Sequence, residues 1–314
     1  MGKPIDVLTV GEPLVLLVAR QAGALDTVKA FDRIVAGAEL NVVTGLARLG
    51  LKTAYVSRVG DDSFGRFLSK AIAAEGIDHS QLLPMRAYPT GFMLKALSVD
   101  GSDPAIEYFR KNSAASQLSV EDLDLDFCDS AQHVHLSGVF AGVSDKARAV
   151  MLALARRARA QGQTLSFDTN LRPSMWPSQQ TMIECINQFA LLADWVLPGL
   201  DEGRLLTGQQ EPEAISQWYL SRGVRAVVVK LGAEGAYCAQ ARQAELVPGR
   251  RVDKVVDTVG AGDGFAVGLI SGLLEGQDLP IATRRANAIG ARVVQFPGDS
   301  DGLPNREQLQ AMMA

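Results

Sequence analysis

The sequence has little cysteine and no long uninterrupted apolar run. Only three cysteines occur among its 314 residues, far apart and odd in number. This excludes a disulfide framework and a zinc site built from paired cysteines, and it favours a reducing compartment. The apolar stretch at 7–18 is broken by Gly11, Glu12 and Pro13, so it is too short for a spanning helix or a secretory signal. We expect a cytoplasmic protein with no membrane partner.

Neither sign of charge is in large excess. The chain carries 31 lysines and arginines against 35 aspartates and glutamates, a formal net charge of −4. A dedicated nucleic-acid binder usually has a basic surplus, so nucleic acid is not an expected partner. Hydrophobic residues at 47% and charged residues at 21% are typical of a folded globular chain. Glycine, in contrast, is abundant with 30 copies, above the usual share of roughly 7%, so the glycine positions are informative.

Short apolar runs of strand length alternate along the chain with longer stretches of helical period. This alternation predicts an α/β fold with a doubly wound, mostly parallel sheet flanked by helices, and a ligand crevice at the carboxyl ends of the strands. The last third of the chain is expected to be helical. The expected strands are 6–10, 53–59, 133–137, 165–169, 195–197 and 226–230, and the expected helices are 40–49, 64–74, 146–160, 182–192, 214–220, 262–274 and 281–294.

Two stretches, 14–35 and 91–110, interrupt this alternation because they look β-rich without intervening helices. We expect a small β-sheet lid projecting from the core, contributed by segments at about 14–35 and 88–113. An antiparallel extension of the main sheet edge is the alternative. No linker rich in proline, glycine or serine divides the chain, so residues 1–314 are expected to form a single domain.

The most informative segment is 257–265, Asp-Thr-Val-Gly-Ala-Gly-Asp-Gly-Phe, which leads into an apolar helix. Gly260, Ala261 and Gly262 have almost no side chain, so their N–H groups can surround an anion, and the helix that begins there adds its positive dipole end. Asp263 in the first turn is placed to accept a proton from an attacking hydroxyl, as in phosphoryl transfer. The alternative is a glycine turn in which Asp263 is an ordinary first-turn residue.

Two further glycine sets are less specific. Segment 230–236, Lys-Leu-Gly-Ala-Glu-Gly-Ala, follows an expected strand, and its lysine and two glycines suit a turn close to a nucleotide. A hairpin turn is an equally good interpretation of this segment. Segment 37–41, Gly-Ala-Glu-Leu-Asn, offers close backbone approach at Gly37 and a donor and acceptor at Asn41 for a polyol hydroxyl. Simple helix capping is the alternative there.

Together these strings resemble the ribokinase/PfkB family of carbohydrate kinases over essentially the whole chain. Segments 37–65 and 257–265 are similar to the first and second signatures of the family. The resemblance implies a ribokinase-like core, ATP as phosphoryl donor, Mg²⁺, and Asp263 as catalytic base. It also implies an anion hole at 260–263 and a monovalent cation such as K⁺ near Asp257. The residues that it implies near the nucleotide are Asn170, Arg172, Lys230, Gly232, Gly235, Gly260, Gly262 and Asn287, and the catalytic residues beside Asp263 are Gly260, Ala261 and Gly262.

The chain departs from the family pattern at one place. Members usually carry an Asn-x-x-Glu motif that organises Mg²⁺ and phosphate through water, and here the matching segment is Gly199 to Glu202. Glu202 is retained, so it is the expected metal-associated residue, acting through water. Loss of the amide at position 199 is expected to weaken the handling of Mg²⁺ without abolishing it, because Mg²⁺ keeps several of its waters in most sites.

Within the family, segment 108–116, Tyr-Phe-Arg-Lys-Asn-Ser-Ala-Ala-Ser, resembles a string of the kinases that act on 2-keto-3-deoxygluconate. Segments 168–172 and 298–304 agree with this subgroup. A sugar acid carries a carboxylate, and the planar guanidinium groups of Arg110 and Arg172 suit it. The alternatives are that Arg110 is a solvated lid residue and that Arg172 binds ATP phosphate. The expected substrate-binding residues are Gly37, Ala38, Asn41, Tyr88, Tyr108, Arg110, Arg172, Asp263 and Asp299.

The resemblance therefore predicts an ATP-dependent kinase for the C6 hydroxyl of 2-keto-3-deoxy-D-gluconate. A kinase of the same fold for a neutral sugar such as fructose or ribose, or for the galacto epimer, is the nearest alternative. A catalytically weak sugar or nucleotide sensor is a more distant one, suggested by Gly199. The expected partners are a small sugar acid and ATP, and a projecting sheet edge suggests a homo-oligomer.

Overall fold

A computed structural model describes residues 3–97 and 105–314, so positions 98–104 of the expected lid segment lie outside the described residues. The strands are β1 (Ile5–Val10), β2 (Leu14–Ala19), β3 (Phe31–Ala36), β4 (Thr53–Gly60), β5 (Leu82–Met85), β6 (Phe92–Lys95), β7 (Ile106–Phe109), β8 (Ala131–Ser137), β9 (Thr164–Asp168), β10 (Trp195–Val196), β11 (Ala226–Lys230), β12 (Gly235–Gln240) and β13 (Gln243–Pro248). The α-helices are α1 (Ala38–Arg48), α2 (Ser63–Ala74), α3 (Leu125–Asp129), α4 (Gly138–Ala141), α5 (Asp145–Ala160), α6 (Gln179–Ala190), α7 (Leu200–Thr207), α8 (Pro212–Leu220), α9 (Ala261–Leu274), α10 (Leu279–Val293) and α11 (Arg306–Met313).

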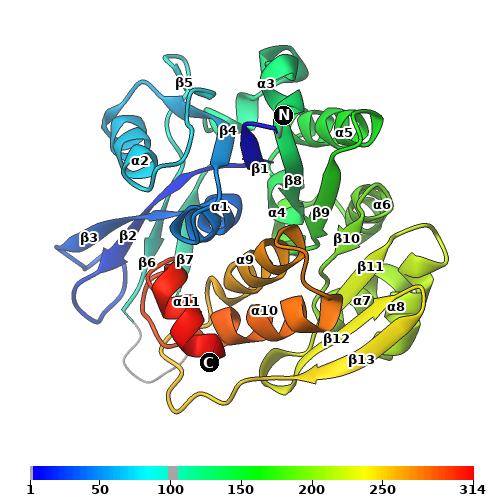
Figure 1. Cartoon of the computed structure of the whole chain (residues 1–314). Coiled ribbons are helices and arrows are strands. Elements are labelled where there is room, and N and C mark those ends of the chain that lie inside the picture. Colours follow the sequence, from blue (N-terminus) through cyan, green and yellow to red (C-terminus); the bar gives the residue numbers. More distant parts are fainter. Residues whose placement is uncertain (1–2, 98–104) are drawn as a thin grey trace.

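The main sheet has nine strands in the order β13-β12-β11-β10-β9-β8-β1-β4-β5 (Figure 1). From β11 to β5 all neighbours pair in parallel, and β12 is antiparallel to both of its neighbours. The chain runs from β1 to β4 on one side and later returns to β8 on the other side of β1. The strand order therefore reverses beside β1, and in such sheets ligands bind at the carboxyl ends of the strands at this point.

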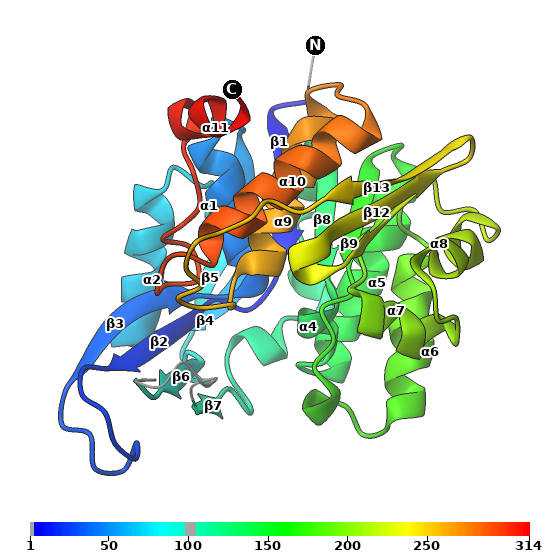
Figure 2. The same ribbon diagram turned by 90° about the horizontal axis from the view of Figure 1, so that it is seen from below.

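Helices cover both faces of the main sheet, as Figure 2 shows from below. Helices α5, α6, α7 and α8 pack with β8 to β11 in one apolar core. Helices α1, α9, α10 and α11 contribute to a second core on the other face. Both faces of the parallel strands are thus buried, which explains why these strands read as continuous apolar runs. The predicted doubly wound α/β fold is confirmed.

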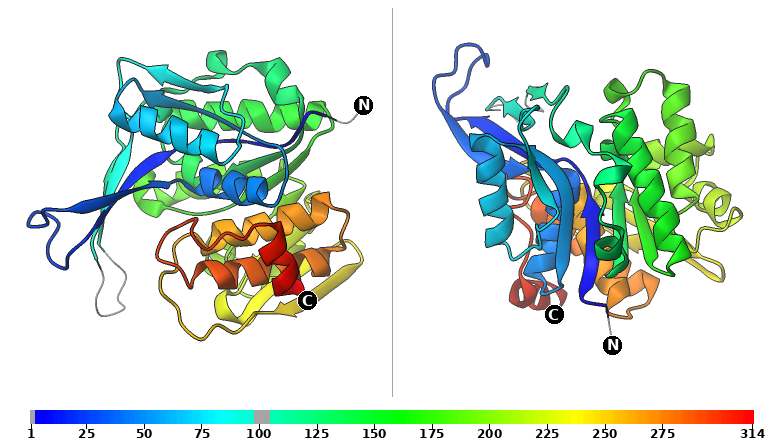
Figure 3. Two further views of the ribbon diagram at one scale, coloured as in Figure 1. Left: turned by 60° about the vertical axis from the view of Figure 1, so that its left-hand side comes forward. Right: turned by 90° about the horizontal axis from the view of Figure 1, so that it is seen from above.

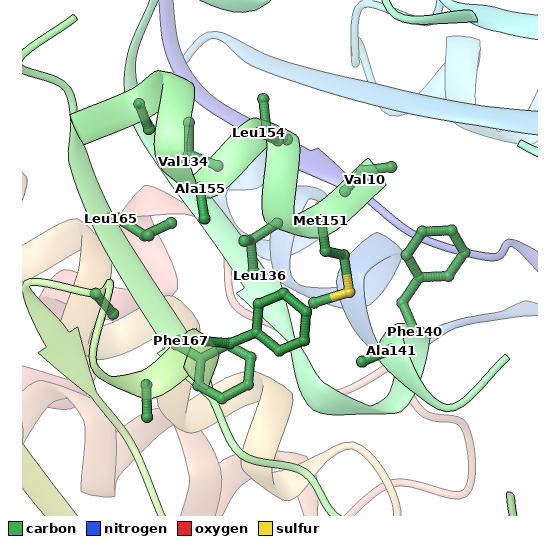
Figure 4. Close-up of a cluster of buried hydrophobic side chains, with 14 of the residues drawn as sticks. Val10, Val134, Leu136, Phe140, Ala141, Met151, Leu154, Ala155, Leu165 and Phe167 are labelled. Atoms are coloured by element: carbon green, nitrogen blue, oxygen red, sulfur yellow. The ribbon is translucent and has the colours of Figure 1, made fainter. Parts of the chain in front are cut away.

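The packing of α5 illustrates how the first core is built. Met151, Leu154 and Ala155 lie on one side of this helix and face side chains of β8 and β9 such as Leu136 and Phe167 (Figure 4). All five are at most 1% exposed. Burying one such large apolar side chain contributes roughly 1.5–3 kcal/mol, so this layer holds the carboxyl ends of β8 and β9 firmly in place.

A second, separate sheet of four strands has the order β3-β2-β6-β7. Strands β2 and β3 and strands β6 and β7 are antiparallel pairs, and β2 and β6 join them in parallel. Figure 3 shows β2 and β3 running outward from the α/β body. The predicted projecting sheet is confirmed, and it is not an extension of the main sheet edge. Among the described residues, no helix is long and apolar enough to cross a membrane.

The expectation of a helical last third is wrong for 235–248. These residues form β12 and β13, and a short 3-10 turn at Gly232–Glu234 joins β11 to β12 in a hairpin. Gly235 has a φ of 110° and packs against the backbone of β13, which only glycine allows. The hairpin turn expected for this segment is therefore present, and a nucleotide close to the turn stays a prediction. Most other expected elements are present within a few residues of their predicted ends.

The close packing of α9 on α10 predicts a stability effect. A Cβ atom at Gly268 would overlap the backbone of Ala286. We expect Gly268→Ala to lower the free energy of unfolding by about 1–3 kcal/mol, as overpacking usually does, although Gly→Ala in an open helix is favourable by up to about 1 kcal/mol. Urea unfolding measures the change. Gly199→Ala is the control because a Cβ there meets only ordinary contacts. A more stable Gly268→Ala would contradict the packing argument.

Candidate active site

One cavity of about 820 Å³ lies where the crevice was expected. Its walls come from the ends of β1 and β9, the N-termini of α1 and α9, and the inner face of the projecting sheet. Its size is within the range of small-molecule sites, roughly 300–1,000 Å³. The predicted site residues that line it are Gly37, Ala38, Asn41, Tyr108, Arg110, Asn170, Arg172, Glu202, Lys230, Gly260, Gly262, Asp263 and Asp299.

The remaining predicted site residues do not line this cavity. Tyr88 is half-buried beyond the end of β5. Gly232 and Gly235 belong to the β11–β12 hairpin, and Asn287 on α10 donates hydrogen bonds to the carbonyls of Val247 and Pro248. These contacts explain how each residue supports the fold, and the binding roles expected of them stay predictions. Ala261 begins α9 between two glycines that do line the cavity.

The N-terminus of α9 is held at the cavity by a glycine in the left-handed region. Gly260 is the N-cap of α9 with a φ of 80°, and a Cβ atom there would overlap the backbone of Asp299. A residue with a side chain would be strained at this φ and would also clash. Because α9 is buried along most of its length, its first N–H groups and the positive end of its dipole are presented to the cavity rather than to bulk water.

Asp263 lies in the first turn of α9 and is 9% exposed. Its Oδ2 accepts a hydrogen bond of 2.8 Å from Asn41 Nδ2 on α1. Burial raises the pKa of Asp263 to about 7, and Asp168 and Asp299 add to this rise, while the Asn41 hydrogen bond and Arg172 lower the pKa. A carboxylate with a pKa near 7 is a better proton acceptor at neutral pH than an ordinary one.

A buried ion pair lies beside the start of α9. Lys230 at the end of β11 pairs with Asp168 at the end of β9, with Nζ and Oδ1 2.8 Å apart. A Cβ built on Gly262 would be 3.7 Å from Lys230 Nζ, so the ammonium lies close to the first turn of α9. Burial lowers the pKa of Lys230, but Asp168 and Glu202 raise it above its ordinary value. The side chain therefore stays charged, and it adds a cation to the anion-binding end of α9.

Glu202 is bound mainly by protein groups. Its carboxylate accepts hydrogen bonds from Thr169 Oγ1 at 2.6 Å and from the N–H groups of Leu171 and Gly199 at 2.6 and 2.8 Å. Burial raises the pKa of Glu202, but Lys230 and these hydrogen bonds bring it below its usual value. No group of three or more potential metal ligands occurs among the residues that the structure describes. Such surroundings would suit a Mg²⁺ ion held mostly by phosphate and water, and the role of Glu202 through water stays a prediction.

Arg110 lies at the end of β7 and is tied to a buried acid. Its Nε donates to Glu12 Oε2 at 2.7 Å, and Ser113 Oγ donates to Glu12 Oε1. Glu12 follows β1 and is 2% exposed. The Nη1 group of Arg110 lies 3.9 Å from Met175 Sδ, away from the acid. The alternative that Arg110 is a solvated lid residue is wrong, because its guanidinium is largely buried and fixed at the cavity wall.

Arg172 lines the same cavity from the loop after β9. Its Nη1 donates to the carbonyl of Leu171 at 2.8 Å. Within the described part of the chain, no carboxylate lies within ion-pair distance of Arg172. Its charge is therefore available to an anion in the cavity.

Five charged residues of the cavity were not among the predicted site residues: Glu12, Glu39, Lys95, Lys111 and Asp168. Glu12 follows the buried strand β1, and Asp168 is the last residue of the buried strand β9. Positions at the carboxyl ends of such strands line the crevice, so the sequence does contain a signal for these two residues. Glu39 stands between Gly37 and Asn41 in the first turn of α1. Burial raises its pKa to about 8, which favours the neutral form of this acid. No local signal marks Lys95.

The comparisons with known proteins agree with this geometry. The model of the pfkB family of carbohydrate kinases matches residues 5–306. The chain belongs to the pfkB family. It is 45% identical over 311 residues to 2-dehydro-3-deoxygluconokinase of Bacillus subtilis, covering 99% of this chain and 96% of that one. It is 32% identical to 2-dehydro-3-deoxygluconokinase of Thermoproteus tenax over 98% and 94% of the two chains.

Its fold is also that of solved kinase structures. A protein from E. coli whose crystal structure contains ATP and Mg²⁺ superposes with a TM-score of 0.91 at 27% identity, over 98% of this chain and 99% of that one. The ribokinase-like fold and the family are thus confirmed. The pfkB chain described here is a sugar kinase, a phosphotransferase with an alcohol group as acceptor.

The burial of Asp263 predicts an unusual titration. We expect its carboxyl carbon to titrate near pH 7 in the ligand-free protein, as measured by ¹³C NMR, because burial disfavours the charged form. Asn41→Leu should move the midpoint to higher pH, since it removes a hydrogen bond that stabilises the carboxylate. Thr44→Val, one turn along α1, should leave the midpoint unchanged. A midpoint near pH 4 in the parent protein would contradict the proposed environment.

Proposed function

We propose that this enzyme transfers the γ-phosphoryl group of ATP to the C6 hydroxyl of 2-keto-3-deoxy-D-gluconate, giving 2-keto-3-deoxy-6-phosphogluconate. The observation that carries the proposal is that two guanidinium groups line the cavity that contains Asp263. A sugar acid would present its carboxylate to these guanidinium groups and its primary hydroxyl to Asp263. The 45% identity to a kinase with this name supports the same substrate.

Recognition of the carboxylate rests on Arg172 and Arg110. Arg172 has no acid partner among the described residues, so a substrate carboxylate would supply one. The Nε and Nη2 groups of Arg110 contact the Glu12 carboxylate, whereas its Nη1 group does not. Nη1 can therefore contact a ligand in the cavity. Because Glu12 fixes the plane of this guanidinium, little side-chain entropy is lost when a ligand binds. Arg172 is exposed to solvent in the open cavity, so its charge is free to pair with an incoming carboxylate, whereas a neutral sugar would make no use of that charge.

The chemical step follows from Asp263 and the start of α9. The substrate hydroxyl donates its proton to the Asp263 carboxylate while its oxygen attacks the γ-phosphorus of ATP. The new O–P bond forms as the bond from the γ-phosphorus to the bridging oxygen breaks, and ADP leaves. The N–H groups at Gly260–Gly262 and the Lys230 ammonium stabilise the charge on the transferring group. Mg²⁺, when bound, would neutralise phosphate charge, with Glu202 and Asp168 facing it through water.

We take residues 1–314 as one catalytic domain in which the projecting sheet covers the sugar. Tyr108 and Phe109 on β7 are 52% and 47% exposed, and this apolar surface supports association of the sheet with a second copy. We also propose that the enzyme acts in the cytoplasm. Its three cysteines are free thiols, as expected in a reducing compartment, and its proposed donor is ATP.

The role of Asp263 is tested by Asp263→Asn. The amide has nearly the same shape but cannot accept the proton, so turnover should fall by a factor on the order of 10²–10⁴. Sugar binding, measured by calorimetry, should change little because the hydrogen bond to Asn41 can be kept with the amide oxygen. Turnover within a few-fold of the parent enzyme would show that Asp263 is not the base.

Substrate choice is tested with a panel of 2-keto-3-deoxygluconate, its galacto epimer, fructose and ribose, with ADP release as the readout. We expect the gluco acid to give the highest kcat/KM. A preference for fructose, ribose or the galacto acid would replace the proposed substrate by that one. Absence of turnover with every sugar would favour a sensor instead.

The carboxylate contact is tested by Arg172→Met, with Arg156→Met on the exposed side of α5 as control. Loss of a charge-assisted hydrogen bond costs roughly 1.5–3 kcal/mol, so KM for the sugar acid should rise about 10- to 100-fold. KM for ATP should change much less. Equal increases in both KM values would mean that Arg172 serves the nucleotide.

A further inference from the structure

Lys95 is a buried cation that the chemistry proposed above does not use. It is the last residue of β6 in the projecting sheet, and its side chain is 7% exposed. Its Nζ pairs with Oδ2 of Asp257, whose side chain is 12% exposed. The two residues are 162 positions apart in the chain. Lys95 thus connects the projecting sheet to the segment that leads into α9.

Asp257 organises the turn before the anion-binding N–H groups. Its second carboxylate oxygen, Oδ1, accepts a hydrogen bond of 3.0 Å from the N–H of Val259. Its own N–H donates to the carbonyl of Val294 at 3.2 Å, as does that of Val256 at 2.7 Å. The carboxylate therefore sets the path of the backbone between β13 and Gly260.

A second acid lies next to this pair. Asp299 is 5% exposed, and its Oδ1 has no hydrogen-bond partner among the described residues. Burial raises the pKa of Asp299 to about 6, Lys95 lowers it, and Asp257 and Asp301 raise it further. The backbone of Asp299 is the surface on which Gly260 packs. Lys95 is therefore the cation that balances the acids on both sides of Gly260.

The monovalent cation implied by the family resemblance does not fit here as an added ion. The carboxylate that would attract such an ion is already paired with the Lys95 ammonium in a buried position. An ammonium group and K⁺ carry the same charge and have similar size, so one can stand in for the other beside a carboxylate. Removing the lysine would leave buried acids without a counter-charge, which costs several kcal/mol and which a small cation from solution could relieve.

We propose that Lys95 is a positioning residue whose ammonium takes the place of a monovalent cation on Asp257 and so holds the turn before α9 in its anion-binding shape. Because Lys95 belongs to β6, this charge is present only when the projecting sheet is docked. The inference rests on the proposed anion site at Gly260–Gly262, but it does not depend on which sugar is phosphorylated.

The first experiment compares the parent enzyme with Lys95→Met in buffers that contain tetramethylammonium, K⁺ or NH₄⁺. ADP is measured directly, so that no coupling enzyme responds to the cation. The parent enzyme should have the same kcat in all three buffers. Lys95→Met should lose at least about tenfold in kcat with tetramethylammonium and recover most of it with K⁺ or NH₄⁺. Lys70→Met, on the exposed side of α2, should behave like the parent enzyme.

The second experiment needs no turnover. K⁺ should raise the Tm of ligand-free Lys95→Met above its value in tetramethylammonium, because an ion binds the folded state in place of the lysine, while the Tm of the parent protein should not respond. Lys95→Gln serves in the same way if the methionine variant does not fold. Cation dependence of the parent enzyme would overturn the proposal. An equal loss of kcat by Lys95→Met in all three buffers would also overturn it. So would a Tm that does not respond to K⁺ in either Lys95→Met or Lys95→Gln. If no sugar is turned over but the Tm response is seen, the proposed function fails and this inference stands.

Discussion

The burial of the Asp263 carboxylate at the start of an almost wholly buried helix is the constraint on which the site depends. A carboxylate in such a place is unfavourable unless it is hydrogen-bonded, and Asn41 supplies the bond from a different helix. That bond fixes α1 and α9 relative to each other at the cavity. The same burial raises the pKa of Asp263 to about 7, so removing the group from water would also suit it to the base role that we propose. Helix packing and chemistry are therefore two results of one arrangement.

Much of the fold could be predicted because it depends on local patterns. Buried parallel strands read as short apolar runs, and β11 was expected with the same ends that the structure has. The segment 257–265 could also be recognised locally, because the left-handed glycine and the apolar helix after it are formed by adjacent residues. The hairpin of β12 and β13 was missed because β13 is mostly exposed and lacks an apolar run.

The pairs that complete the site could not be predicted in this way. Arg110 and Glu12 are 98 residues apart, and Lys95 and Asp257 are 162 apart, so neither pair leaves a pattern in the sequence. Each pair depends on how the projecting sheet sits on the main body. The segment carrying Arg110 was identified by its resemblance to a family string, but the acid that orients its guanidinium was not. Lys95 had no such string, and its role emerges only from its contacts.

The projecting sheet therefore does more than cover the cavity. Strand β6 ends in Lys95 and its neighbour β7 leads into Arg110, and the two cations pair with different acids of the main body. Arg110 pairs with Glu12, and Lys95 pairs with Asp257 in the segment that leads into α9. Both acids belong to the main body and are largely buried, so each would be left without its counter-charge if the sheet moved away. Such a loss is costly in a low-dielectric environment, so docking of one sheet supplies the counter-charge of both acids together. If the proposed roles hold, covering the sugar and shaping the turn before α9 are then one event.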